Sequence, residues 1–518
     1  MRQLATLKVS LADVAMAAML AVSMVDVRAV SAQSSTALAA TVTYPKIDLK
    51  KDCGATGDGT TNDTAAFWKA AELIQKAGGG TLVVPRATYI VGRQEHVAGK
   101  PPYYQPQRIF AVDRVNFLLI EGNGATLRFA PGLRFGSFDP ETGEAYNLPK
   151  MPFFDRSYVA QAVPIIEITG SRHVTIRDLE LDGNSPNFIL GGAWGDTGRQ
   201  LGGDGTLLYG NTDVQLSKVN SHHHPRDGIM IGWPGLKESD PATPHALTDC
   251  TFESNGRQGL SWVGGRGLKA YRCKFNHTAR VPVGGAVLRS APAAGLDIEA
   301  EESVCRDGYF EDCEFMDNGG CGMVADSGDG GYTKFVRCTF WGTTSWSAWS
   351  AKPGLRYEDC KFHGSIVHAH GSSDPALATS WTRCTFEDKP WTDGKRSYGN
   401  FLAEINGDIP NVRFDACTFI ANTCKSIWCS GNGATFSDCA FTHKNALLSE
   451  GDFQCLIRGG VLRGCCFKEQ FPPETKATWF IASEGTRILG GKPTTVDGPH
   501  VHWAGRNGQF GRLRPTRK

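Results

Sequence analysis

The chain has 518 residues, of which 41% are hydrophobic and 61 are glycines. Its 54 basic and 53 acidic residues nearly cancel, so the overall charge gives no case for binding nucleic acid or an anionic membrane surface. The glycine content is well above the usual share of about 7%, which favours many tight turns over long helices.

The N-terminus has the pattern of an export signal. Basic residues near the start precede an apolar run over 14–25, which is too short to span a bilayer. The tripeptide Val30-Ser31-Ala32 then supplies the small residues that a signal peptidase accepts. We therefore expect a signal peptide over 1–32, a polar linker over 33–45 and a secreted or periplasmic protein. No later run is apolar enough to predict a membrane span.

A capping helix is predicted next. The segment 54–66 is rich in Gly, Thr, Asn and Asp and leads into a helix expected over 64–77. Asn62 and Asp63 are suited to cap the start of this helix, and three glycines end it. Such a helix fits the polar-faced cap that a solenoid needs on its open end. The spacing of Asp58 and Asp63 does not fit a calcium loop, so turn and cap roles are expected of them.

Short alternating strands follow, first in aliphatic residues and then in a Cys-x-Phe repeat. Apolar residues alternate at 115–119, 174–181 and 214–219, with Gly, Asn and Asp turns between them. The tripeptide Cys-x-Phe then recurs nine times, mostly at steps of 22–26 residues, which is one coil of a β-helix. Because its middle residue is usually polar, Cys and Phe are expected to face inward in columns with a spacing of about 4.8 Å. The nine cysteines are Cys250, Cys273, Cys313, Cys338, Cys360, Cys384, Cys417, Cys439 and Cys465.

Sixteen cysteines in an exported protein would ordinarily suggest disulfides. The nine in the repeat all point into the core, where a free cysteine behaves as a small hydrophobe, so we expect buried thiols there. The better disulfide candidates are Cys424 with Cys429, and Cys465 with Cys466.

These elements predict an all-β fold, namely a single-stranded right-handed parallel β-helix (solenoid) with an N-terminal capping helix. The β-helix domain is expected over 46–505 and a basic C-terminal tail over 506–518.

The opening segment, 47–91, resembles the N-terminal segment of the pectate-lyase-like superfamily, which contains phage tailspikes, polygalacturonase-type glycoside hydrolases and mannuronan C5-epimerases. The resemblance implies the β-helix fold and work on carbohydrate by hydrolysis, β-elimination or epimerisation, without choosing among them. Asn211-Thr212-Asp213 matches the first catalytic element of polygalacturonases, but the later elements are missing. The arginine motif of calcium-dependent pectate lyases is also missing, which argues against pectin as the substrate.

Three carboxylates are the predicted catalytic group. If the apolar residues of 296–298 and 323–325 face inward, then Asp297, Glu299 and Asp326 face outward. Glu299 and Asp326 would occupy one column on successive coils, with backbones about 5 Å apart. Neighbouring carboxylates raise one another's pKa, which supplies the protonated and the ionised partner that a glycosidase needs. The alternative is an ordinary solvated acidic face, since two further glutamates follow directly.

A second group, His224, Arg226 and Asp227, is predicted to bind substrate, because an arginine binds a uronate carboxylate and a histidine can do acid–base work. The alternative is that Asp227 only shapes a turn. His222 and His224 would face the same way, but no third ligand is evident, so no metal site is predicted. The other predicted substrate-binding residues are Trp233, Trp349, His368 and His370.

Glycoside hydrolysis is the favoured function, because carboxylates outnumber basic residues in the expected groove. A lyase or C5-epimerase acting on a uronic-acid polymer is the alternative, with its chemistry assigned to Arg226, His224, Tyr271 and Arg257. A non-catalytic glycan-binding β-helix is the third possibility. The expected partner is a polysaccharide or oligosaccharide; no cofactor, metal or nucleic acid is expected, and the oligomeric state stays open.

Overall fold

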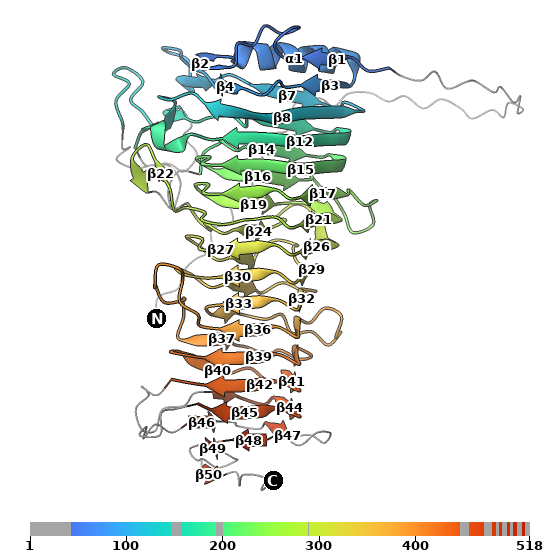
Figure 1. Cartoon of the computed structure of the whole chain (residues 1–518), viewed down its shortest axis with the longest axis vertical. Coiled ribbons are helices and arrows are strands. Elements are labelled where there is room, and N and C mark those ends of the chain that lie inside the picture. Colours follow the sequence, from blue (N-terminus) through green and yellow to red (C-terminus); the bar gives the residue numbers. More distant parts are fainter. Residues whose placement is uncertain are drawn as a thin grey trace, which may run out of the picture. The chain divides into compact units, whose positions relative to one another are not determined.

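The computed structural model describes residues 43–146, 157–192, 200–287, 290–445 and 455–470, together with strands and single residues between 479 and 512. Residues Tyr44–Lys518 form one unit built of parallel strands stacked coil upon coil, with a single α-helix in the described residues (Figure 1). The predicted signal peptide and all but the last residues of the linker lie outside the described residues.

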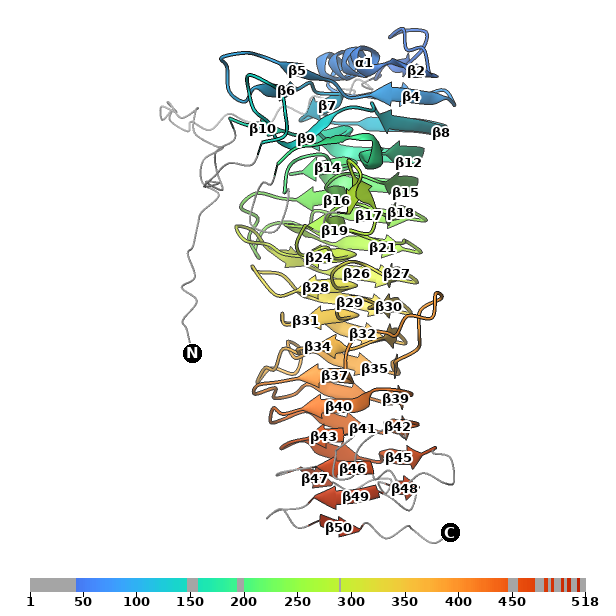
Figure 2. The same cartoon turned by 90° about the vertical axis from the view of Figure 1, so that its left-hand side faces the viewer.

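Helix α1 (Thr64–Ala77) covers the first coil, as the sequence predicts (Figures 1 and 2). The Asn62 side chain accepts a hydrogen bond from the Thr64 backbone N–H at 3.2 Å, which helps to cap the helix. Asp63 instead accepts the backbone N–H groups of Thr56 and Gly57 at 2.7 and 3.0 Å and closes the preceding turn. The helix ends at Gly78, whose φ of 69° is a left-handed conformation that favours glycine.

One side of the solenoid, here called sheet I, is a 15-stranded sheet that is parallel except for its last pair. It contributes one strand to each coil, so its neighbouring strands come from successive coils. Its strands, in spatial order, are β7 (Phe110–Asp113), β11 (Ile166–Thr169), β14 (Thr206–Tyr209), β16 (Asp227–Gly232), β19 (Gln258–Trp262), β24 (Leu296–Ile298), β28 (Met323–Ala325), β31 (Ala348–Ser350), β34 (Ile366–Val367), β37 (Phe401–Ile405), β40 (Lys425–Cys429), β43 (Cys455–Ile457), β46 (Trp479–Ala482), β49 (Val501–Ala504) and β50 (Phe510–Arg512). The last of these strands lies within the residues predicted as the C-terminal tail.

The opposite wall, here called sheet II, begins with the short strands of the first two coils and continues with three long strands. These are β1 (Lys46–Asp48), β2 (Asp58–Asn62), β3 (Gly80–Val83), β4 (Thr88–Val91), β8 (Leu118–Phe129), β12 (Arg172–Asp182) and β15 (Thr212–His222). Later coils split this wall into two short strands each. The first of each pair are β17 (His245–Thr248), β21 (Leu268–Tyr271), β26 (Gly308–Glu311), β29 (Thr333–Val336), β32 (Arg356–Glu358), β35 (Ser380–Thr382), β38 (Arg413–Asp415), β41 (Thr435–Ser437), β44 (Val461–Arg463) and β47 (Arg487–Ile488). The second are β18 (Thr251–Glu253), β27 (Glu314–Met316), β30 (Thr339–Trp341), β33 (Lys361–His363), β36 (Thr385–Glu387), β39 (Thr418–Ala421), β42 (Ala440–His443), β45 (Cys466–Glu469) and β48 (Thr495–Asp497).

The nine repeat phenylalanines form one continuous stack through the core, as predicted. All are fully buried, and successive rings lie 4.6–5.5 Å apart and within 10° of parallel. A second stack of aromatic rings runs beside it through Phe310, Phe335, Tyr357, Trp381, Phe414 and Phe436. The register between coils is therefore set by aromatic residues that stack on the equivalent aromatic residues of the next coil.

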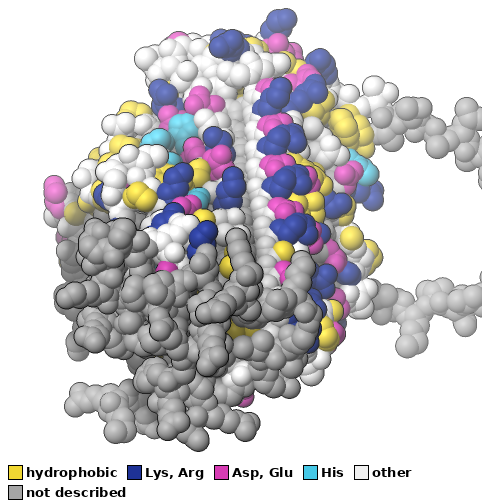
Figure 3. Space-filling model, turned by 60° about the horizontal axis from the view of Figure 1, so that its bottom comes forward, with side chains coloured by type: hydrophobic (Ala, Val, Ile, Leu, Met, Phe, Trp, Pro, Cys, Tyr) yellow, Lys and Arg dark blue, Asp and Glu magenta, His cyan; other side chains and the backbone are white. Residues whose placement is uncertain are grey.

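The corner that splits sheet II carries alternating charges. The residue before each repeat cysteine has a positive φ, and in six successive coils it is alternately Asp and Arg: Asp249, Arg272, Asp312, Arg337, Asp359 and Arg383. Each arginine binds the aspartate of the preceding coil through two hydrogen bonds of 2.6–3.0 Å. On the face shown in Figure 3, acidic and basic side chains follow one another along a band of the surface. Alternation avoids the repulsion that a column of like charges would suffer.

All sixteen cysteines are free, so the prediction of buried thiols in the repeat is confirmed and both predicted disulfides are wrong. Cys465 is fully buried and Cys466 half-buried, because adjacent residues of a strand point to opposite faces. Cys424 directly precedes strand β40 and Cys429 is its last residue, so the two are about 16 Å apart along the extended chain, which is beyond the reach of a disulfide.

In the described part of the chain, no helix has the length and apolar character needed to cross a membrane.

Candidate functional site

The strands that carry the predicted carboxylates pair in the predicted register. Leu296 lies opposite Met323 and Asp297 opposite Val324, and the apolar residues at 296, 298, 323 and 325 are completely buried. Beyond the strands the register slips by one residue, since Ala300 lies opposite Gly328. Glu299 therefore lies between Asp326 and Ser327 of the next coil rather than squarely opposite Asp326.

Asp297 is not in an open groove, contrary to the prediction. It is only 2% exposed, and its carboxyl group accepts a hydrogen bond of 2.7 Å from the side chain of Gln258. The Gln258 side chain is held in turn by the backbone N–H of Ala294 at 3.0 Å. Burial, and then the charge of Glu299, raise the pKa of Asp297 well above its usual value. Asp297 is therefore a buried carboxyl group whose surroundings disfavour its charged form.

Glu299 and Asp326 are the accessible members of the group. Glu299 is half-buried and accepts a hydrogen bond of 2.6 Å from Ser327, whereas Asp326 is exposed. After burial, the charges of Glu299 and Asp326 also raise the pKa of Asp297, whereas that of Arg257 lowers it. The catalytic assignment of the three residues stays a prediction.

Two of the predicted substrate-binding residues lie beside this group. Trp349 follows Val324 on the next coil of sheet I, and its ring lies 5.0 Å from that of His368. Burial lowers the pKa of His368, while the charge of Asp326 opposes that shift. His370 is also half-buried, with its backbone N–H bonded to Thr379 Oγ1 at 2.8 Å. Trp233, by contrast, directly follows β16, two coils before Glu299.

The prediction that His224 binds substrate is wrong. Its side chain is fully buried, its Nε2 lies 3.1 Å from the backbone oxygen of Leu181, and burial lowers its pKa to about 3. The alternation rule assigned it to the surface, but His223 before it has a φ of 56°, which breaks the strand and turns the next side chain inward.

Arg226 and Asp227 belong to a buried ionic network that the sequence did not reveal. Asp227 is completely buried and lies 3.3 Å from Arg257, 2.9 Å from Ser261 and 3.6 Å from Arg226. Arg226 also lies 3.5 Å from Asp204, and burial raises the pKa of Asp204 to about 6. Arg226 and Arg257 thus pair with aspartates of the protein itself, so we no longer expect them to bind a uronate.

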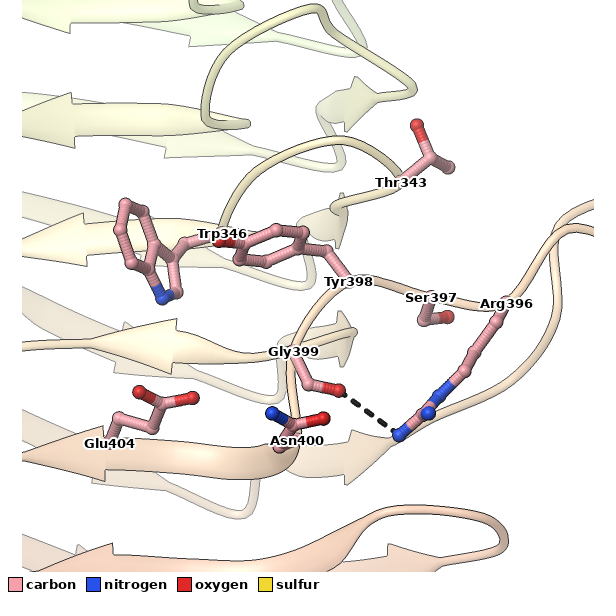
Figure 4. Close-up of a pocket in the computed structure, with 8 residues that line it drawn as sticks. All are labelled: Thr343, Trp346, Arg396, Ser397, Tyr398, Gly399, Asn400 and Glu404. Carbon is pink, nitrogen blue, oxygen red and sulfur yellow. Dashed lines mark hydrogen bonds between the residues drawn. The ribbon is translucent and has the colours of Figure 1, made fainter.

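A pocket with a volume of about 460 Å³ lies further along the solenoid, beside sheet I (Figure 4). Trp346 and Tyr398 face each other edge to face at 5.5 Å, and Glu404, Asn400 and Arg396 complete its polar lining. Burial raises the pKa of Glu404, although a hydrogen bond from Ser365 opposes the shift. The ring centres of Trp346 and Trp349 are 5.1 Å apart, so a row of aromatic rings extends from this pocket towards the carboxylates. The sequence did not predict this pocket, because the loop 388–398 beside it has no repeated pattern of residues.

Comparison with known proteins agrees with the fold. The family model described as "Right handed beta helix region" matches residues 164–373. No curated protein matches the sequence. The A-module of a mannuronan C-5 epimerase from Azotobacter vinelandii is similar in structure, with 13% identity, a TM-score of 0.44 and coverage of 87% of this chain and 100% of that one. The pre-mature bacteriophage phi29 gene product 12 has 12% identity, a TM-score of 0.45 and coverage of 87% and 56%.

An endo-xylogalacturonan hydrolase from Aspergillus tubingensis is also similar, with 12% identity, a TM-score of 0.33 and coverage of 88% and 100%. These identities concern the fold alone. The chain folds as a right-handed parallel β-helix, which confirms the predicted fold class.

Proposed function

We propose that this protein binds a carbohydrate polymer along the outer face of sheet I and hydrolyses a glycosidic bond beside Glu299 and Asp326. The proposal rests on one observation. Two accessible carboxylates lie on the same face as a row of aromatic rings, those of Trp349, Trp346 and Tyr398, in which each ring contacts the next. Aromatic rings offer flat apolar surfaces to the C–H faces of sugar rings, and polar groups beside them fix the orientation of a ligand.

The distances suit a ligand of several sugar units. The residues in register from Val324 through Trp349 and Val367 to Glu404 span three coil steps, about 14 Å. The chain of sugars would therefore lie parallel to the solenoid axis, with its cleaved bond near Asp326 and another unit in the Glu404 pocket.

Glycosidic hydrolysis needs one carboxylic acid and one carboxylate. We assign proton donation to Glu299, whose half-buried carboxyl group is positioned by Ser327, and attack or activation of water to the exposed Asp326. Burial raises the pKa of Asp297 beneath them, which disfavours a third negative charge in the group. It is a positioning residue in this proposal, not a group that touches the substrate.

The test is a panel of plant, algal and bacterial polysaccharides incubated with the parent protein and with Glu299→Gln, Asp326→Asn and Glu301→Gln. Glu301 is the matched control, because it is an exposed glutamate two residues from Glu299. New reducing ends should appear with the parent and the control, and both active-site variants should lose at least about 100-fold in kcat. Near-parental turnover by both Glu299→Gln and Asp326→Asn would place the chemistry elsewhere.

A second function, elimination or epimerisation on a uronic-acid polymer, is favoured by one observation. Burial lowers the pKa of His368, which favours the neutral imidazole that a base needs to remove the proton at C5 of a uronate. Products with ultraviolet absorbance from a new C=C bond, or altered sugar configuration without cleavage, together with loss of activity in His368→Asn, would establish this reaction in place of hydrolysis. Tight glycan binding without any product would favour a binding protein.

A further inference from the structure

A group of polar residues on sheet II, separate from the sheet I face, has the composition of a metal site. Asp182 is the last residue of β12 and His222 the last residue of β15, and the two lie opposite each other in register. One ligand atom from each of Asp182, His222 and His223 lies within 4.8 Å of the other two. All three residues are half-buried, so they are accessible from solvent.

The positive φ of His223 creates this group. In a regular strand, His222 and His223 would face opposite sides. The left-handed conformation at His223, with φ of 56°, brings both rings to one side, where their Nδ1 atoms are 2.7 Å apart and the rings are nearly perpendicular. Because the sequence suggested His224 as the partner of His222, this third ligand was missed.

The residues around the group hold its side chains in place through hydrogen bonds, as residues around a bound metal do. Glu180 Oε1 lies 3.0 Å from His222 Nε2, and a carboxylate only accepts, so Nε2 carries the proton and the lone pair of a neutral His222 is on Nδ1. Metal-bound histidines usually donate their other N–H to a carboxylate in this way. Glu180 is held in turn by the Thr126 hydroxyl group.

Asp182 is also held in place. Its Oδ2 accepts a hydrogen bond from Arg128 Nε at 2.7 Å, and its Oδ1 accepts the backbone N–H of Asn184 at 2.8 Å and lies 3.9 Å from His222 Nδ1. Glu253 lies in register with His222 on the next coil. The group thus has three carboxylates, those of Glu180, Asp182 and Glu253, and one arginine, Arg128. This excess of negative charge favours the binding of a cation.

We propose that Asp182, His222 and His223 bind a divalent transition-metal ion such as Zn²⁺ through one carboxylate oxygen and two imidazole Nδ1 atoms. Two nitrogen ligands favour Zn²⁺ over Ca²⁺ or Mg²⁺, which prefer oxygen. Tetrahedral Zn²⁺ separates its ligands by about 3.4 Å, so the 2.7 Å and 3.9 Å separations need to change by only about 0.7 Å or less. On binding, His223 moves its proton from Nδ1 to Nε2 or releases it. Three protein ligands leave the fourth position open to water.

The experiment is calorimetric titration of the chelator-treated full chain with Zn²⁺, and it needs no substrate, so its outcome is independent of the glycan hypothesis. The variant is His223→Asn, because asparagine tolerates the left-handed conformation and lacks the imidazole. The matched control is His173→Asn, an exposed histidine that also has a positive φ and lies 2.6 Å from Asp213.

One Zn²⁺ per chain should bind to the parent and to His173→Asn, and this binding should be lost in His223→Asn. Glu180→Gln should bind Zn²⁺ 10–100-fold more weakly, because it loses the carboxylate that orients His222. Circular dichroism will establish that each variant is folded. Absence of Zn²⁺ binding by the parent, or equal binding by parent and His223→Asn, for instance by thiols, would overturn the proposal.

Discussion

The stack of phenylalanines is expected to dominate the stability of the solenoid, and Phe362 tests this most directly. Its ring is fully buried between Phe340 and Phe386, at 4.9 Å from each and within 8° of parallel to both. Phe362→Ala should lower the free energy of unfolding by about 3–5 kcal/mol, the usual cost of removing a buried phenyl ring. Phe362→Leu keeps most of the apolar volume but loses two ring stacks, so it should cost about 1–3 kcal/mol.

Urea unfolding followed by tryptophan fluorescence is the suitable assay. For a unit of this length that unfolds together, the entropy of unfolding is about 1 kcal/mol/K, so each kcal/mol shifts Tm by only about 1 °C. Trp68→Ala is the control, because Trp68 is 56% exposed on α1 and its removal should change stability by no more than about 0.5 kcal/mol. If Phe362→Ala costs no more than Trp68→Ala, the stack does not carry the stability assigned to it.

Three further outcomes are expected. Thiol titration without reductant should show two accessible cysteines in the native protein, Cys53 and Cys466, and all sixteen after denaturation; a shortfall would indicate disulfides. Burial lowers the pKa of His245 to about 4, below its unfolded value of about 6.5, so stability should fall as the pH drops from about 6.5 to 4, by an amount of order 3 kcal/mol for this residue. His245→Asn should make urea stability less dependent on pH in that window, and an unchanged dependence would contradict this. Exported protein should begin at Gln33 after cleavage behind Ala32, as N-terminal sequencing will show, whereas an intact Met1 would exclude it.

The repeat explains why so much of the fold was predictable. Each Cys-x-Phe tripeptide states which residues face inward, and stacking like on like sets the register between coils. The pairing of Leu296 with Met323 followed from the same alternation, whereas the catalytic grouping of Asp297, Glu299 and Asp326 stays a prediction.

The errors occur where the chain leaves a strand. A single positive φ at His223 turned His224 into the core and His223 towards His222, and no period in the sequence marks such a residue. A one-residue slip moved Glu299 relative to Asp326. The surroundings of Asp227 and Asp297 include residues from neighbouring coils, such as Arg257 and Gln258, which alternation along one strand does not place.

The buried ionic network offers a prediction of its own, because its charges can be removed singly or together. Asp227 is completely buried, and one of its carboxylate oxygens has no hydrogen-bond partner among the described residues, so it depends on Arg257 at 3.3 Å. Arg257→Met should therefore lower the free energy of unfolding by about 3–5 kcal/mol, since it leaves a buried charge without its closest cation.

Asp227→Asn in the same chain should restore part of that loss, because the charge left behind is then also removed. The two changes together should cost less than the sum of the single changes by about 0.5–3 kcal/mol in urea unfolding. The exposed pair of Arg383 and Asp359 is the control, and the same cycle there should show little coupling because solvent screens the charges. Costs that simply add at Arg257 and Asp227 would mean that the two residues do not stabilise each other. Arg226 and Arg257 would then again be candidates for binding an acidic sugar.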